Sequence, residues 1–166
     1  MSDDQLMGFG EGTFDPPRFS ISTAIYAERA DNKILLLRRA EGSAMAGAYF
    51  LPGGVLDEGE EPYEAARREL REESGLEIIG DLTMVGAYPM WVYGREFMQL
   101  TFHGNVGDDV KLSHEHTAHR WVDPSEFAGR LTPDVITSMA DGNERIHRLL
   151  TNIAEDGQRY LKYRAG

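Results

Sequence analysis

The segment from Gly54 to Leu76, GVLDEGEEPYEAARRELREESGL, constrains the fold of this chain more strongly than any other part of the sequence. Its first part is rich in glycine and acidic residues, which predicts a turn-rich loop. Pro62 is favoured at the first position of a helix. Gly75 suits the left-handed conformation at which a helix ends. The segment therefore predicts one helix that begins at Pro62 and ends at Ser74.

Acidic side chains are concentrated on one side of this predicted helix. Glu69, Glu72 and Glu73 fall within an arc of about 100° on a helix of 3.6 residues per turn. Like charges three and four residues apart repel each other by a few tenths of a kcal/mol, so the cluster does not stabilise the helix. Mg²⁺ is commonly held by one or two carboxylates together with phosphates and water. The cluster alone is therefore compatible with a metal site for phosphate chemistry, although a solvated acidic face is the commoner explanation of such a charge run.

The spacing of the fixed residues is more specific than the acidic cluster alone. Along the chain it is Gly54, five residues, Glu60, seven residues, Arg68-Glu69-Leu70, one residue, Glu72-Glu73, one residue and Gly75-Leu76. This spacing resembles the signature box of the Nudix (MutT-like) hydrolases and departs from it at no position. The resemblance implies an α/β/α sandwich with a mixed central sheet. It also implies an enzyme that cleaves the diphosphate bond of a nucleoside diphosphate derivative, which leaves open nucleoside triphosphates, ADP-ribose or nucleotide sugars, and dinucleoside polyphosphates.

The resemblance further implies roles for individual residues of the box. Mg²⁺ or Mn²⁺ would be bound by the carbonyl of Gly53 and by three carboxylates, those of Glu69, Glu72 and Glu73. Glu69 is also a candidate for orienting or deprotonating the attacking water. Structural support is expected from Gly54, Glu60 and Arg68, with Glu60 paired to Arg68.

The segment SHEHTAHRWVDP contains further candidates for catalysis or metal binding. Its Glu115 resembles a glutamate that, in many Nudix proteins, reaches the metal site from a mobile loop before a Trp-Val strand. Glu115 is therefore a candidate extra ligand or general base, with an exposed loop carboxylate as the alternative. The spacing of His114, His116 and His119 could suit zinc, but strand alternation places His119 on the other face. Surface histidines are the expectation.

Three residues outside the box are candidates for substrate binding. Arg39 ends a predicted strand and could contact a phosphate, although a surface ion pair is the stronger expectation. Tyr49 lies where Nudix proteins often carry tryptophan and could stack on a base, although a core or rim position is the stronger expectation. Tyr93 lies 17 residues after Leu76, a spacing that resembles a tyrosine of diadenosine polyphosphate hydrolases.

The rest of the sequence predicts strands on both sides of the central helix. Alternating apolar residues predict strands over residues 19–27, 33–39, 82–88, 95–104 and 116–122, with a short apolar piece at 49–51. Helices are predicted at 125–127 and at 143–161, the latter weakened near its end by Gly157. Residues 1–17 are expected to form an arm, and residues 18–166 a single Nudix domain.

Composition narrows the range of partners. The 166 residues carry a net charge of −11, which disfavours tight binding to a nucleic-acid polymer but suits a small nucleotide bridged by a cation. The absence of cysteine excludes disulfides, thiol catalysis and cysteine-based zinc sites. No apolar run comes near the roughly 18 residues of a membrane span, and no signal peptide is visible, so a cytoplasmic protein without a membrane partner is expected. A homodimer is left open, and the alternative function is a non-catalytic nucleotide sensor or regulatory module.

Overall fold

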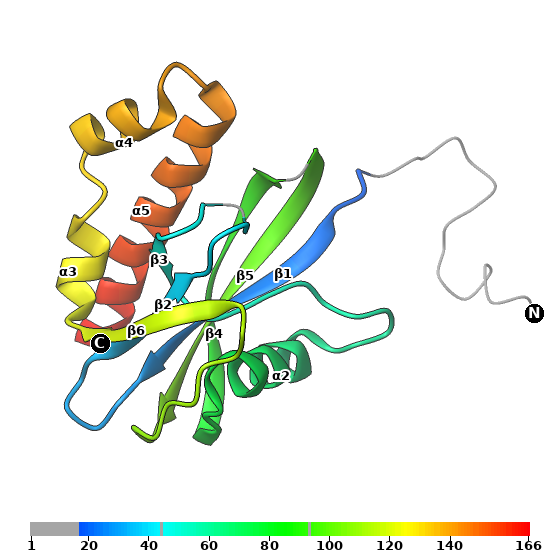
Figure 1. Cartoon of the computed structure of the whole chain (residues 1–166), viewed down its shortest axis with the longest axis vertical. Coiled ribbons are helices and arrows are strands. Elements are labelled where there is room, and N and C mark those ends of the chain that lie inside the picture. The colour runs from blue at the N-terminus through cyan, green and yellow to red at the C-terminus, as the bar shows by residue number, and fades with distance from the viewer. Residues whose placement is uncertain (1–16, 44, 93) are drawn as a thin grey trace, which may run out of the picture.

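The computed structural model describes residues 17–43, 45–92 and 94–166, which form a mixed sheet between helices (Figure 1). The described strands are β1 (Ser20–Glu28), β2 (Ile34–Arg39), β3 (Tyr49–Phe50), β4 (Ile78–Val92), β5 (Arg95–Val106) and β6 (His116–Val122). The described helices are α2 (Pro62–Ser74), α3 (Pro124–Gly129), α4 (Pro133–Ala140) and α5 (Glu144–Ala165). None of these helices is both long and apolar enough to cross a membrane. The predicted arm lies outside the described residues, apart from Pro17.

The sheet has the strand order β3-β2-β1-β5-β4, with β6 paired to β2. β1 and β5 run parallel, whereas the other neighbouring strands are antiparallel. Among the described residues, β1 is in register with β2 at a single pair, Glu28 and Ile34. The two strands therefore diverge from this point, and the sheet opens toward the C-terminal end of β2.

Where β2 diverges from β1, the backbone of Pro52 and Gly54, in the loop between β3 and α2, pairs with β1 instead. The amide of Thr23 donates a hydrogen bond of 2.8 Å to the carbonyl of Gly54, and the amide of Ile25 donates one of 2.9 Å to the carbonyl of Pro52. Because β1 is the central strand of the sheet, these bonds fix the glycine loop to the middle of the sheet.

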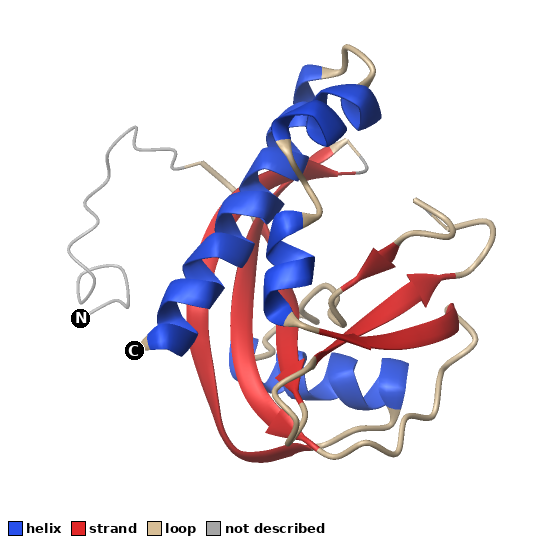
Figure 2. Cartoon of the chain, turned by 90° about the vertical axis from the view of Figure 1, so that its left-hand side faces the viewer, coloured by secondary structure: helices blue, strands red, loops and turns tan. Residues whose placement is uncertain are grey.

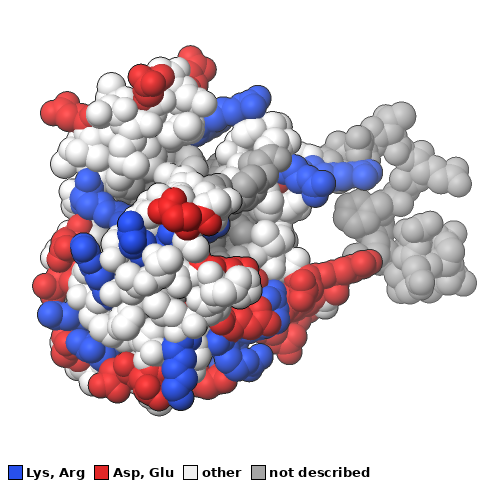
Figure 3. Space-filling model, viewed as in Figure 1, with Lys and Arg blue, Asp and Glu red and all other residues white. Residues whose placement is uncertain are grey.

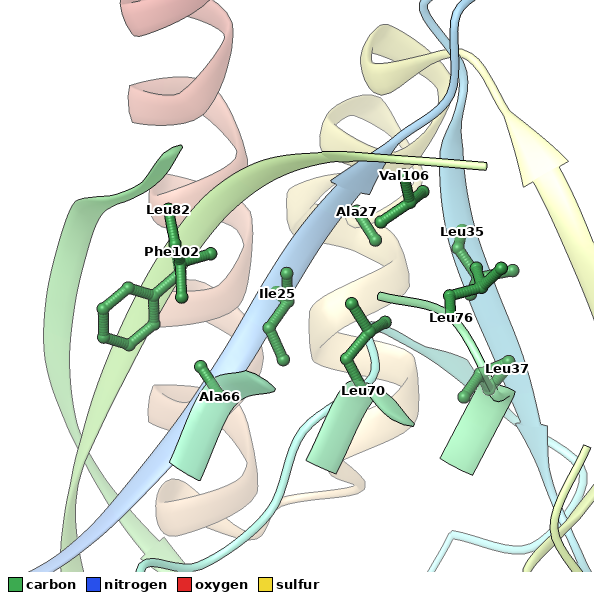
Figure 4. Packing of buried hydrophobic residues seen from close by; sticks show 10 residues of the cluster. All are labelled: Ile25, Ala27, Leu35, Leu37, Ala66, Leu70, Leu76, Leu82, Phe102 and Val106. Carbon is green, nitrogen blue, oxygen red and sulfur yellow. The ribbon is translucent and has the colours of Figure 1, made fainter. Parts of the chain in front are cut away.

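Alternation along β1 and β2 gives the sheet two apolar faces, each covered by helices (Figure 2). The first face packs against α2, and this core includes Ile25, Ala27, Leu35, Leu37, Ala66 and Leu70 (Figure 4). The second face packs against α3 and α5, and its core includes Tyr26, Ile34, Leu36, Phe127 and Tyr160. The α/β/α sandwich expected from the sequence is confirmed.

Several elements extend beyond the predicted ranges. β4 covers Ile78–Val92 because bulges near Ile79 and Met84 interrupt the alternation without ending the strand. Helix α4 was not predicted, and it begins where the Thr132 side chain accepts a hydrogen bond from the Val135 amide. Helix α5 continues to Ala165 through Gly157.

Gly157 has a role in packing α5 against α3, although glycine has a low intrinsic preference for a helix. A Cβ at this position would lie 3.1 Å from the Cα of Ala128, which is tighter than ordinary contact. The glycine therefore lets α5 approach α3 closely, and the packing that results outweighs its low intrinsic preference for a helix.

Candidate active site

Two glycines bring the loop before α2 directly against the carboxylates of that helix. The Gly53 amide donates a hydrogen bond of 2.8 Å to Oε2 of Glu73. Gly53 has a φ of 154°, and a Cβ there would overlap the carbonyl of Thr23 in β1. A Cβ at Gly54 would overlap the carboxylate of Glu69. The close approach of loop and strand therefore requires glycine at position 53, whereas a side chain at position 54 would displace the Glu69 carboxylate.

Arg68 holds carboxylates of the box and the preceding loop together. Its guanidinium donates to both carboxylate oxygens of Glu60, at 2.8 and 3.0 Å. It also donates to Glu69 at 2.9 Å, to Glu72 at 3.1 Å and to the Val55 carbonyl at 3.1 Å. The hydrogen bonds from Arg68 are the largest cause that holds the pKa of Glu60 at about 2. The predicted pairing of Glu60 with Arg68 is thus present, and it ties the loop to α2.

Glu73 is the most buried of these carboxylates, with 6% of the residue exposed. Its pKa is raised to about 8, chiefly by burial and also by the neighbouring charges of Glu69 and Glu115, against the opposing effects of the Gly53 amide and Arg39. Burial also raises the pKa of Glu69. A divalent cation neutralises such a group of carboxylates and reverses these shifts.

Glu115 and His116 reach the same place from β6 and the turn before it. The ligand atoms of Glu73, Glu115 and His116 all lie within 4.8 Å of one another. Two backbone hydrogen bonds anchor this turn: the Ser113 amide donates to the Glu73 carbonyl at 3.2 Å, and the Ala40 amide donates to the Glu115 carbonyl at 2.9 Å. Glu115 therefore approaches α2 from a segment that is fixed to the end of that helix.

His116 lies beside the carboxylates of the site, although the sequence led us to expect a surface histidine. Its side chain is 6% exposed. A bulge in β6 skips Thr117, so that Arg39 is paired with His116 although Arg38 is paired with Ala118. The bulge turns His116 to the face that carries Arg39, and bulges re-aim side chains in this way beside active sites. Burial lowers the pKa of His116, and Arg39 adds to the effect.

The residues present fit a divalent cation. Carboxylate oxygens are the ligands that Mg²⁺ and Mn²⁺ take, and Glu69, Glu73 and Glu115 provide them within one cluster. Glu72 lies at the more exposed edge of this cluster, with 57% of its side chain accessible. Nε2 of His116 lies 3.7 Å from Oε1 of Glu73, which places a second kind of donor atom at the same place.

A cavity of about 250 Å³ adjoins the carboxylates. Gly53, Gly54 and Arg39 line it beside the cluster, and the rest of its lining is largely apolar and aromatic. Gln99 supplies a polar group in this wall, where its Oε1 accepts a hydrogen bond of 2.7 Å from the Ser22 hydroxyl. The cavity thus joins an acidic end to an apolar chamber, as a pocket for a phosphorylated aromatic ligand would.

The three residues predicted to bind substrate differ in their position relative to the cavity. Arg39 lines the cavity, and its buried Nε has no hydrogen-bond partner in the described part of the chain. Tyr49 is not among the described residues that line the cavity, because its ring packs beneath the guanidinium of Arg120 at 4.5 Å. Tyr93 lies outside the described residues. Gln99 was not singled out from the sequence, since one glutamine on a strand carries no distinguishing pattern.

Known proteins share both the sequence pattern and the fold of this chain. A family model described as "NUDIX domain" matches residues 18–142. A "MutT-like protein" of Streptomyces ambofaciens is 34% identical over 117 residues, which cover 70% of this chain and 71% of that protein. A "CTP pyrophosphohydrolase" of Escherichia coli (strain K12) is 35% identical over 97 residues, which cover 58% of this chain and 70% of that protein. The solved structure of a MutT protein from Methanosarcina mazei Go1 has a TM-score of 0.61 and 27% identity, and the match covers 86% of this chain and 98% of that one.

The family match spans most of the chain and includes every residue of the acidic cluster described above. The chain therefore belongs to the Nudix family, and it is a hydrolase that acts on phosphoric anhydrides.

Proposed function

We propose that the chain is a metal-dependent pyrophosphohydrolase that cleaves the diphosphate bond of a nucleoside diphosphate derivative. The observation that carries this proposal is the position of the acidic cluster beside Arg39, at one end of an apolar cavity. The carboxylates suit a cation, Arg39 suits a phosphate oxygen, and the cavity suits a base. The name of the Escherichia coli relative, "CTP pyrophosphohydrolase", agrees with a small nucleotide as substrate.

Glu69, Glu72 and Glu73 are the proposed ligands of Mg²⁺ or Mn²⁺, with Glu115 and the Gly53 carbonyl as further oxygen donors. When bound, such a cation neutralises phosphate oxygens, polarises the phosphorus and lowers the pKa of a coordinated water. The hydrogen bonds from Arg68 hold the carboxylates of Glu69 and Glu72 in place for this role.

The side chains of the enzyme position the diphosphate and accept the proton of the water. Arg39 donates to a phosphate oxygen through its guanidinium, which already lines the cavity. Glu69 accepts a proton from the attacking water, and Glu115 is the second candidate. The water oxygen bonds to phosphorus while the bridging oxygen leaves with the electrons of the broken bond. The products are two phosphate-bearing fragments.

The cavity favours a substrate with one nucleoside. Its volume of about 250 Å³ is below the roughly 300–1,000 Å³ of pockets that enclose drug-sized ligands. Gln99 presents an amide in the cavity wall, held by Ser22, that could read the polar edge of one base. Nucleoside triphosphates, including oxidised ones, are therefore the leading substrates. ADP-ribose and nucleotide sugars come next, and dinucleoside polyphosphates follow them.

The test is a phosphate-release screen across deoxynucleoside and ribonucleoside triphosphates, ADP-ribose, sugar nucleotides and dinucleoside polyphosphates, each with Mg²⁺ and with Mn²⁺. We expect Glu73→Gln to lower turnover of the best substrate by about 100-fold or more, because even a residue that only supports a metal ligand commonly contributes 10- to 100-fold. Glu64→Gln is the matched control, since Glu64 is exposed in the first turn of the same helix. Full metal-dependent turnover by Glu73→Gln would rule out the proposed site.

The same screen separates the enzyme from a nucleotide sensor. A sensor would bind one of these ligands by calorimetry and release no product with either metal. Hydrolysis by the wild type and not by Glu73→Gln, at equal protein concentration and equal folded fraction, would exclude the sensor.

A further inference from the structure

His116 has no role in a site that is made only of oxygen ligands. Its ring is nine-tenths buried and lies against the carboxylate of Glu73, with Nε2 3.7 Å from Oε1. That distance is too long for a hydrogen bond. Within the described residues, the buried Nδ1 has no partner either. A buried imidazole without hydrogen bonds carries an uncompensated cost of desolvation, so its position calls for a further binding partner.

The distances in this cluster are those of ligands around one metal ion. Ligand atoms about 2.1 Å from an ion lie about 3 Å apart at adjacent corners of an octahedron and about 4.2 Å apart at opposite corners. The separation of 3.7 Å between His116 Nε2 and Glu73 Oε1 falls between these values. The ligand atoms of Glu73, Glu115 and His116 lie within 4.8 Å of one another. Shifts of a few tenths of an ångström would bring all three to a shared ion.

The backbone holds His116 in this place. The bulge in β6 pairs His116 with Arg39, and the His116 amide donates to the Ser113 carbonyl at 3.3 Å. Ser113 is in turn bonded to the end of α2 through the Glu73 carbonyl. The imidazole and the carboxylate are therefore fixed to one another through the main chain, which preorganises them as a pair.

We propose that His116 supplies a nitrogen ligand, together with Glu73 and Glu115, to a divalent cation in this site. The inference rests on the metal dependence in the proposed function and adds a preference among metals. Mg²⁺ takes oxygen ligands, whereas imidazole suits transition metals. His116 thus shifts the selectivity of the site from Mg²⁺ toward Mn²⁺ and its heavier neighbours.

Pulsed electron paramagnetic resonance of bound Mn²⁺ tests the ligand directly. The full chain is freed of metal with EDTA, loaded with MnCl₂ below one equivalent, and examined by electron spin-echo envelope modulation. We expect ¹⁴N couplings in the wild type, replaced by ¹⁵N couplings when the protein is labelled at histidine. Mn²⁺ bound tightly without any histidine nitrogen coupling would overturn the proposal, and this outcome needs no variant.

Two variants then assign the nitrogen. His116→Asn should abolish the coupling, whereas His119→Asn, a change at an exposed position of the same strand, should retain it. By calorimetry, His116→Asn should raise the Kd for Mn²⁺ about ten-fold or more and the Kd for Mg²⁺ by less than about three-fold. Equal losses for both metals would mark a purely structural role for His116 and contradict the proposal.

The outcomes also separate this inference from the proposed function. If Mn²⁺ binds and supports hydrolysis without a histidine coupling, the oxygen-ligand enzyme stands and the inference fails. If a histidine coupling is present but no substrate of the screen is hydrolysed, the nitrogen ligand stands and the proposed hydrolysis fails.

Discussion

The carboxylate of Glu73 is buried between the Gly53 amide and the His116 ring, and burial raises its pKa from 4.5 to about 8. Between these two pH values the unfolded chain has lost the proton of Glu73, whereas the folded chain retains it. The folded state then binds more protons than the unfolded state, so the free energy of unfolding falls as pH rises from about 4.5 to 8. At neutral pH without metal, Glu73 therefore lowers the free energy of unfolding, although it is a proposed ligand of the metal.

The fall in the free energy of unfolding with rising pH gives a prediction for Glu73→Gln, the variant used in the activity test. A glutamine at position 73 keeps an acceptor for the Gly53 amide but cannot ionise. We expect Glu73→Gln to raise the free energy of unfolding of the EDTA-treated protein by about 2–4 kcal/mol at pH 8, and by under about 1 kcal/mol at pH 5. Urea unfolding at the two pH values measures this. Glu72→Gln, the control, loses an exposed ion pair to Arg68 and should change stability by less than about 1 kcal/mol. A gain for Glu73→Gln that is equal at both pH values would contradict the assignment.

Residues of the site differ in how far the sequence could predict them. The acidic side chains of α2 were predictable because helical geometry turns their spacing into a common face. His116 was not, because one extra residue at Thr117 reverses the alternation on which strand predictions depend. Gln99 and Ser22 come together only through the parallel pairing of β1 with β5, which joins residues 77 positions apart.

At the level of elements, the end of helix α5 is joined to β1 by an ion pair between the partly exposed Arg164 and the buried Glu28. Arg164 donates to both oxygens of Glu28 at 2.7 and 2.9 Å, and the Tyr160 hydroxyl donates to the same carboxylate at 2.7 Å. Burial acts to raise the pKa of Glu28, but the hydrogen bonds from Arg164 and Tyr160 outweigh it and leave the pKa below 4.5. This contribution to stability is present above pH 4.5 and is lost as pH falls through the lowered pKa.

Removing Arg164 should therefore loosen α5 in a pH-dependent manner. We expect Arg164→Gln to lower the free energy of unfolding by about 2 kcal/mol at pH 7, because Glu28 stays buried with a weaker set of donors. The difference from the wild type should narrow as pH falls from 4.5 through the lowered pKa of Glu28, because the carboxylate becomes protonated. Chemical unfolding followed by circular dichroism at pH 7 and pH 3.5 provides the measurement. Lys162→Gln, an exposed change two residues earlier, should leave stability nearly unchanged at both pH values. A loss for Arg164→Gln that does not depend on pH would contradict this account.

The elements themselves were predictable to different degrees. The bounds of α2 agree with the sequence because Pro62 and Gly75 mark both ends chemically. The extent of β4 and the end of α5 were not predictable, because tertiary pairing and packing decide them. Pairing with β5 continues on both sides of the bulges in β4, so the strand does not end there. Gly157 lies against Ala128 of α3, and this packing allows α5 to continue through the glycine.

For the whole molecule, the distribution of charge links metal binding to the stability of the fold. The chain has 28 acidic and 17 basic residues, and acidic side chains gather over α2 and the loop before it (Figure 3). The carboxylates of α2 repel one another in the folded state, because the helix holds them close together. When the chain unfolds, these carboxylates move apart and the repulsion decreases. A divalent cation in the site therefore binds the folded state in preference to the unfolded state, and by linkage it must stabilise the fold.

Metal removal should accordingly lower the thermal stability of the entire domain. At a concentration of 100 times its Kd, Mn²⁺ should stabilise the folded protein by about 2.7 kcal/mol, which raises Tm by roughly 5–10 °C for a chain of this length. Since binding displaces the proton of Glu73, the Kd for Mn²⁺ should be lower at pH 8, and the shift at one fixed Mn²⁺ concentration should be larger at pH 8 than at pH 6. Scanning calorimetry of EDTA-treated protein with and without MnCl₂ measures it. A Glu69→Gln, Glu73→Gln double variant is the control, because it loses two carboxylates of the site but keeps most of the net charge of −11, so general charge screening acts on it to a similar extent. An equal rise in Tm for the wild type and the double variant would assign the stabilisation to ionic strength and not to the site.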